Sequence, residues 1–181
     1  MIGFKKSNIP NYISAFRLCL IPLFLYFYFV ERNIVRATVT FVAAGASDVL
    51  DGYLARHNNW TSNLGRILDP LADKCMQATV LVSLSIDGII PWLISGILIG
   101  KEIVLALGAT RLIKKFDTYA QSRWYGKGAV VLFYAIVIVL MLADGLSQSV
   151  RTILSSILIV AMLFALVMYY KKYFISRNKK S

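Results

Sequence analysis

Long apolar segments separated by short polar ones constrain this chain more than any other feature of its sequence. Six of them follow one another, at about residues 12–30, 33–56, 66–86, 90–113, 124–143 and 149–170. Each is close to the roughly 20 residues that a helix needs to cross a bilayer. The hydrophobic content of 58% exceeds the roughly 45–50% of soluble domains. We therefore expect an all-α integral membrane protein with six transmembrane helices, in a single domain over residues 1–181.

The basic residues predict how this chain is oriented. The formal net charge is +11, and the cations cluster at the ends of the predicted helices, which favours membrane topology and phosphate-bearing lipids over nucleic acid. One side of the membrane receives Lys5, Lys6, Arg56, Arg66, Arg111, Lys114, Lys115, Arg123, Lys127, Lys171, Lys172, Arg177, Lys179 and Lys180, and the other receives Arg32, Arg36 and Arg151. By the positive-inside rule, both termini face the cytoplasm. The expected location is a bacterial-type cell (inner) membrane.

The first apolar segment follows a basic lead-in, as in a signal peptide. No small-residue cleavage site follows residues 21–30, so we expect a retained first span. Cys19 and Cys75 lie inside apolar segments, too far apart in sequence for a zinc knuckle. We interpret both cysteines as buried, reduced packing residues.

Four carboxylates interrupt the second and third apolar segments: Asp48, Asp51, Asp69 and Asp73. An isolated charge near a bilayer centre costs roughly 2.5–3.5 kcal/mol, so these acids need a partner. Spacings of three and four residues place each pair on one helix face, and the loop 57–64 lets the two faces converge at the cytoplasmic boundary. Oxygen ligands suit Mg²⁺ or Mn²⁺, and four carboxylates are enough for two ions about 3.5–4 Å apart, as in phosphoryl chemistry.

The residues between the acids predict a phosphate-bearing substrate. Gly52 and Gly65 leave room for a bulky ligand near the backbone, and Arg56 offers a fork for a phosphate. A pyrophosphate presented at the membrane surface would fit this arrangement. Asp73 is our candidate for the general base, because it lies one turn beyond Asp69.

Other polar residues inside the apolar segments have two interpretations each. Asp69 precedes Pro70 and could be only a helix cap, although a cap would explain one acid and not the other three. Arg17 could extend to the interface or point into a polar cavity, and its position favours the cavity. Lys101 and Glu102 could neutralise each other or line a second polar site.

The acid-rich stretch resembles a known enzyme family. The pattern Asp48-x2-Asp51-Gly52-x2-Ala55-Arg56-x8-Gly65-x3-Asp69-x3-Asp73 matches the signature of the CDP-alcohol phosphotransferases at every fixed position. The resemblance implies a six-helix membrane fold, usually dimeric, that transfers a phosphatidyl or similar group from a CDP-linked donor to an alcohol and releases CMP. It implies that Asp48, Asp51 and Asp69 hold two metal ions, with Asp73 sharing one and acting as base. It also implies that the CDP pocket is lined by Gly52, Ala55, Arg56 and Gly65.

The acceptor alcohol is predicted from sequence outside that motif. The runs NIPNYISAFRLCLIP and LGRILDPLADK resemble bacterial members of the family that transfer a phosphatidyl group from CDP-diacylglycerol to glycerol 3-phosphate. Gly126-Lys127 is similar to their fifth-helix Gly-Lys, so Lys127 and Arg111 are the expected contacts to the acceptor phosphate. In the fourth helix those enzymes have a shorter interval, whereas Arg111 here follows Glu102 by nine residues. Members whose acceptor is phosphatidylglycerol therefore remain an alternative.

Two further classes of protein are compatible with acids in an apolar chain. In a divalent-cation transporter the acids would be distributed along the path or in inverted halves, whereas here they occur in one stretch. In a structural membrane protein they would pair with basic side chains such as Arg56, Arg66, Lys74 and Lys101. That second interpretation gives no reason for two glycines at these positions.

Overall fold

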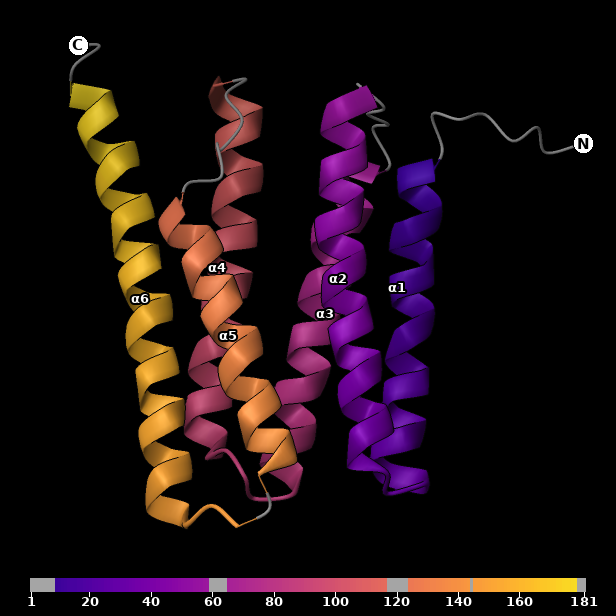
Figure 1. Ribbon diagram of the computed structural model, residues 1–181. Helices are drawn as coiled ribbons and strands as arrows, with labels where there is room; N and C mark the ends of the chain where they lie inside the picture. Colours follow the sequence, from indigo (N-terminus) through magenta and orange to yellow (C-terminus); the bar gives the residue numbers. More distant parts are fainter. Residues whose placement is uncertain (1–8, 59–64, 117–123, 144, 179–181) are drawn as a thin grey trace, which may run out of the picture. The chain divides into compact units, whose positions relative to one another are not determined.

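Every regular element in the described part of the chain is helical, as the sequence predicts. The computed structural model describes residues 9–58, 65–116, 124–143 and 145–178, with side chains described over most of 15–104 outside 48–70, and over most of 126–168. The elements are α1 (Ile9–Leu25), the π-helical turn η2 (Tyr26–Val30), α2 (Ile34–Asn58), α3 (Gly65–Ile86), α4 (Trp92–Phe116), α5 (Trp124–Leu142) and α6 (Gln148–Asn178) (Figure 1).

The helix ends agree with the predicted spans within about three residues, except at the end of α6. There the apolar segment stops near Tyr170, but the helix continues to Asn178. Lysine and arginine are good helix formers, so a basic stretch ends hydrophobic character without ending the helix. Hydropathy therefore marks the limit of the apolar segment and not the limit of the element.

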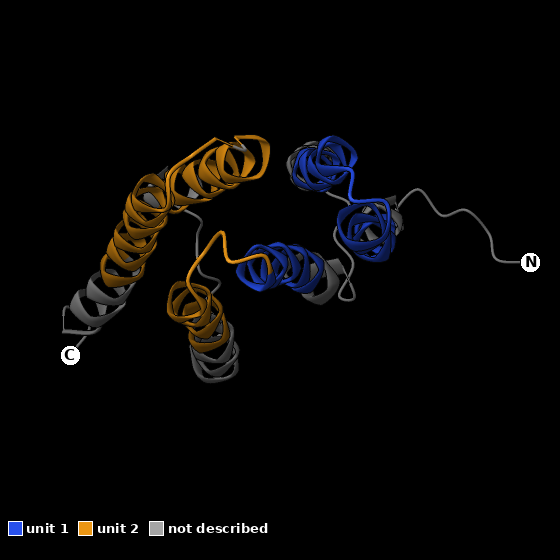
Figure 2. Ribbon diagram, turned by 90° about the horizontal axis from the view of Figure 1, so that it is seen from below, with its two compact units in different colours: residues 1–86 blue, residues 87–181 orange. Residues whose placement is uncertain are grey.

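The chain divides into two compact units, residues 1–86 and 87–181 (Figure 2). In the first unit α1 contacts both α2 and α3, and α2 also contacts α3. Its core is aromatic and aliphatic, with fully buried Phe24, Tyr28, Phe41, Met76 and Leu84. Within this unit α2 ends and α3 begins at the end where α1 starts (Figure 1). The two acid-bearing segments are thus brought to one end of the unit.

The opposite end of the first unit is closed by a tight turn between η2 and α2. Arg32 has a positive φ of 53° there. The amide of Asn33 donates to the carbonyl of Phe27 at 2.9 Å, and the side chain of Asn33 accepts from the amide of Arg36 at 3.0 Å. Asn33 therefore caps α2 and satisfies one of its unpaired amides.

In the second unit α6 contacts both α4 and α5. Its buried residues include Ile90, Leu98, Phe133, Val137 and Leu158. Gly88 has a φ of 69°, which explains why the chain turns at the Asp87-Gly88 pair predicted as a turn. The single-domain prediction for the whole chain stays a prediction.

One helical stretch among the described residues, Gln148–Met168 in α6, is long and apolar enough to cross a membrane. Three shorter apolar stretches lie at Ala15–Val30, Ile34–Ser47 and Gly128–Leu142. The prediction of six helices is confirmed, whereas six transmembrane spans remain a prediction.

Candidate active site

All four motif acids lie in helices that contact each other. Asp48 and Asp51 belong to the last third of α2, and Asp69 and Asp73 to the first half of α3. In an α-helix, residues three or four positions apart share a face, so the predicted pairing of the acids within each helix is confirmed at the level of the backbone. The side chains of Asp48, Asp51 and Asp69 lie outside the described residues.

The interpretation of Asp69 as a helix cap is wrong. The helix α3 begins at Gly65, four residues earlier, so Asp69 and Pro70 lie inside its first two turns. Pro70 has no amide hydrogen to donate, but the helix continues through it to Ile86. Asp69 thus shares the helical register of Asp73.

Asp73 is the motif acid whose side chain is described, and its carboxylate is largely buried. The side chain is 13% exposed. Both carboxylate oxygens accept hydrogen bonds from Nε2 of Gln77, at 3.2 and 3.1 Å. The ammonium of Lys74 lies 3.4 Å from Oδ2. Gln77 lies outside the acid motif of the sequence, although its four-residue spacing from Asp73 is a signal that predicts this contact.

Arg17 points inward and does not extend to the interface. The residue is fully buried, and its Nε donates to the hydroxyl of Ser47 at 3.3 Å. Ser47 directly precedes Asp48 and stands one helical turn before Asp51. The hydroxyl of Ser47 in turn donates to the carbonyl of Ala44 at 2.7 Å. This contact joins α1 to α2 beside the first pair of acids, and it places a buried cation in the unit that carries them.

The predicted CDP-binding residues occupy the same helical segments as the acids. Gly52, Ala55 and Arg56 lie in the last two turns of α2, and Gly65 is the first residue of α3. Their side chains lie outside the described residues, and so does residue range 59–64 of the connecting loop. Their roles in substrate binding stay predictions.

The predicted acceptor contacts come from the second unit. Arg111 lies near the end of α4, and Lys127 is the fourth residue of α5. Both side chains lie outside the described residues. A role for either residue in acceptor binding therefore stays a prediction.

Lys101 and Glu102 form an ion pair in the interior of the second unit. The ammonium lies 2.5 Å from Oε1 of Glu102, and the two side chains are 7% and 18% exposed. Lys101 also contacts the sulfur of Met162 in α6 at 3.3 Å. Of the two interpretations offered by the sequence, mutual neutralisation is the one that this contact supports.

The prediction that both cysteines are buried is wrong. Cys19 is exposed and Cys75 is half-buried, and both are free thiols. Both residues lie on helices, where the side-chain direction depends on the helical face and not on the apolar character of the segment.

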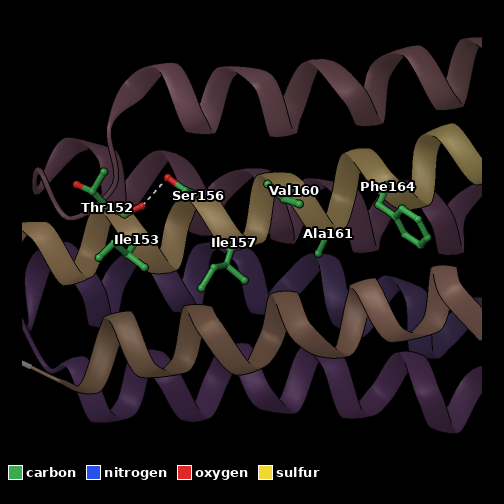
Figure 3. A pocket seen from close by; sticks show the side chains of 7 residues that line it. All are labelled: Thr152, Ile153, Ser156, Ile157, Val160, Ala161 and Phe164. Atoms are coloured by element: carbon green, nitrogen blue, oxygen red, sulfur yellow. Dashed lines mark hydrogen bonds between the residues drawn. The ribbon is translucent and has the colours of Figure 1, made fainter.

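An apolar groove of about 540 Å³ runs along one face of α6 (Figure 3). It is lined by Thr152, Ile153, Ser156, Ile157, Val160, Ala161 and Phe164. Its two hydroxyl groups donate to the backbone carbonyls four residues earlier, at 2.9 and 2.8 Å. The lining offers no charged group that could bind a pyrophosphate.

Comparison with known proteins identifies the family. The CDP-alcohol phosphatidyltransferase family matches residues 7–170, which include all four acids, the predicted CDP-binding residues and both predicted acceptor contacts. The chain belongs to this family of enzymes. That membership favours an enzyme over the transporter and the structural protein that the composition also allows.

Named relatives fall into two groups within the family. A CDP-diacylglycerol–glycerol-3-phosphate 3-phosphatidyltransferase of Pseudomonas fluorescens is 38% identical over 64% of this chain and 66% of its own length. One of Aquifex aeolicus is 41% identical over 66% of this chain and 67% of its own length. A cardiolipin synthase (CMP-forming) of Streptomyces coelicolor is 35% identical over 78% of this chain and 68% of its own length. About a third of each relative therefore lies outside the match.

Proposed function

We propose that this protein transfers a phosphatidyl group from CDP-diacylglycerol to glycerol 3-phosphate, giving phosphatidylglycerophosphate and CMP in phospholipid biosynthesis. The observation that carries the proposal is the placement of the four motif acids in helical register on α2 and α3, which contact each other. The names of the relatives from Pseudomonas fluorescens and Aquifex aeolicus support the choice of acceptor.

The donor set fits Mg²⁺ or Mn²⁺. Carboxylate oxygens are the ligands that these ions prefer, and the largely buried carboxylate of Asp73 accepts only part of the hydrogen bonds that its lone pairs allow. Asp48, Asp51, Asp69 and Asp73 would hold two ions. When bound, these ions neutralise the charge that develops on the pyrophosphate oxygens.

The chain's own residues would transfer the proton and bind the two substrates. Asp73 accepts the proton of the acceptor hydroxyl, whose oxygen attacks the phosphorus that bears the diacylglycerol. The bond from that phosphorus to the CMP oxygen breaks, and Arg56 binds the departing phosphate through its planar fork. Gly52, Ala55 and Gly65 leave space for the nucleotide, while Arg111 and Lys127 bind the phosphate of glycerol 3-phosphate.

In this proposal the protein is a homodimer of six-span chains in the cell (inner) membrane. Both termini and the active site face the cytoplasm, because the chain places most of its cations on that side. The apolar stretch of α6 and the shorter apolar stretches of α1, α2 and α5 support a membrane location.

A cardiolipin synthase is the second candidate. The relative from Streptomyces coelicolor aligns over 78% of this chain, more than either relative that uses glycerol 3-phosphate. The acceptor would then be phosphatidylglycerol, and the chemistry at Asp73 would be the same.

The decisive experiment measures CMP release from CDP-diacylglycerol by the purified full chain in detergent. Parallel reactions contain glycerol 3-phosphate, phosphatidylglycerol, serine, inositol phosphate or no acceptor, each with Mg²⁺, with Mn²⁺ or with a chelator. We expect metal-dependent release stimulated by glycerol 3-phosphate. Stimulation by phosphatidylglycerol alone would identify the second candidate, and release that is insensitive to chelation would contradict the metal-dependent mechanism.

A further inference from the structure

The carboxylate of Asp73 is held from within its own helix. Gln77 stands one turn further along α3 and is 3% exposed. Its Nε2 lies 3.2 Å from Oδ1 and 3.1 Å from Oδ2 of Asp73, so one amide nitrogen spans both oxygens. A contact to both oxygens restricts the rotation of the carboxylate about its last torsion.

Lys74 determines which end of the Gln77 amide faces Asp73. Its Nζ donates to Oε1 of Gln77 at 3.3 Å. An ammonium has three donors and no acceptor, so it bonds to the oxygen of the amide and not to the nitrogen. The amide nitrogen is therefore directed at the carboxylate, which can only accept while it is ionised. A reversed amide would bring oxygen against oxygen and leave Lys74 facing a donor.

We propose that Gln77 is a positioning residue for Asp73, oriented by Lys74, which presents the carboxylate to the divalent metal and to the acceptor hydroxyl. The inference rests on the proposed function. Groups that bond to a metal-binding side chain fix its orientation, and their loss typically lowers metal affinity or activity about 10- to 100-fold. A neutral amide suits this task, because it orients the carboxylate without neutralising it and leaves other lone pairs available.

A purely structural role for Gln77 predicts a different result. A buried amide needs hydrogen-bond partners in any case, and Asp73 and Lys74 supply them. If that were the whole role, replacing the amide by an apolar side chain of similar length would alter stability alone. The test therefore has to separate metal binding and turnover from folding.

The experiment compares the full chain in detergent with Gln77→Met, which keeps the length of the side chain and removes its amide. Ser83→Ala is the matched control, because Ser83 is a fully buried polar residue of α3 whose hydroxyl donates to the carbonyl of Thr79 at 2.9 Å. Two quantities are measured: the Mn²⁺ concentration that gives half of the metal-induced rise in Tm, and kcat and KM for CMP release.

We expect Gln77→Met to raise the half-effective Mn²⁺ concentration about 10-fold and to lower kcat about 10-fold, with KM for CDP-diacylglycerol nearly unchanged. Ser83→Ala should leave all three at wild-type values. Wild-type metal response and kcat in Gln77→Met would overturn the proposal, and so would equal losses in the two variants.

Lys74 provides a second test that does not depend on the folding of Gln77→Met. Lys74 is one third exposed, so its replacement disturbs packing less. Lys74→Met should raise the half-effective Mn²⁺ concentration about 3-fold. Lys74→Arg should keep it near the wild-type value, because arginine also donates without accepting. A wild-type metal response in Lys74→Met would contradict the role of Lys74 in orienting the amide.

The two readouts also separate this inference from the proposed function. An enzyme that binds Mn²⁺ through Gln77-dependent contacts but releases no CMP with glycerol 3-phosphate would refute the proposed function and retain the positioning role. If the wild-type enzyme is active with glycerol 3-phosphate but Gln77→Met keeps wild-type kinetics and metal response, the positioning role is refuted and the proposed function is retained. A wild-type protein with neither metal response nor turnover would refute both.

Discussion

Two acidic side chains, one in each unit, are largely buried but meet different partners. Asp73 in α3 receives its two shortest described contacts from the neutral amide of Gln77, while the ammonium of Lys74 stands 3.4 Å away. Glu102 in α4 contacts the ammonium of Lys101 at 2.5 Å. The carboxylate of Glu102 is paired directly with an ammonium, whereas that of Asp73 is contacted most closely by a neutral amide and at a longer distance by an ammonium.

From this difference we propose that the first unit supplies the reactive groups. A tight internal ion pair uses its charge for the protein's own structure. A carboxylate whose shortest contacts come from a neutral amide is suited to bind a cation or to accept a proton from outside the chain. In this proposal the donor chemistry belongs to the first unit, where Arg17 is buried against Ser47, the residue that precedes Asp48 in the sequence.

The largest effect is expected from Asp73→Asn, which keeps the shape of the side chain and removes its basicity. CMP release should fall about 10²- to 10⁴-fold, the range that a general base contributes. Asp87→Asn is the control, because Asp87 is an exposed acid just beyond the other end of α3 and should retain wild-type turnover. Turnover close to wild type in Asp73→Asn would contradict the base assignment and remove the contrast between the two acids.

The next effect concerns stability in the second unit. Lys101→Met leaves the partly buried carboxylate of Glu102 without its ammonium partner, and the free energy of unfolding should fall by roughly 3 kcal/mol. Turnover per folded molecule should change little. The double variant Lys101→Met/Glu102→Leu should recover most of the lost stability, measured as Tm in detergent. A double variant that is stable but inactive would show that the pair lines a functional site.

A smaller effect is expected at the two residues proposed to contact the acceptor. Arg111→Gln or Lys127→Gln should raise KM for glycerol 3-phosphate about 10-fold, or roughly 1.4 kcal/mol, and leave KM for CDP-diacylglycerol unchanged. Arg36→Gln is the control, because Arg36 is an exposed arginine paired with Glu31. Equal changes in both KM values would mean that these residues do not bind the acceptor phosphate.

The smallest effect is expected from Glu31→Gln, which removes the exposed pair between Glu31 and Arg36 at 2.7 Å. Exposed pairs contribute roughly 0.2–1 kcal/mol because water screens them. The change in Tm should therefore be much smaller than for Lys101→Met. A loss as large as that of Lys101→Met would contradict the distinction between buried and exposed pairs.

Several features of the candidate site could be predicted from the sequence because they depend on local spacing. The apolar segments predicted six helices, and the intervals between the acids predicted their register on α2 and α3. The contact between Gln77 and Asp73 could be predicted in the same way, since the two residues are four positions apart. The contact between Arg17 and Ser47 could not, because the two residues are 30 positions apart and meet only when α1 packs on α2.

The sequence by itself determined the helical elements and the family motif, because helix periodicity and segment hydropathy act over a few residues. Tertiary structure decided which way individual side chains face. It left Cys19 exposed, buried Arg17 against α2, and placed Lys101 next to Met162 of α6. These outcomes depend on which helical faces pack together, and hydropathy along one segment carries no information on that choice.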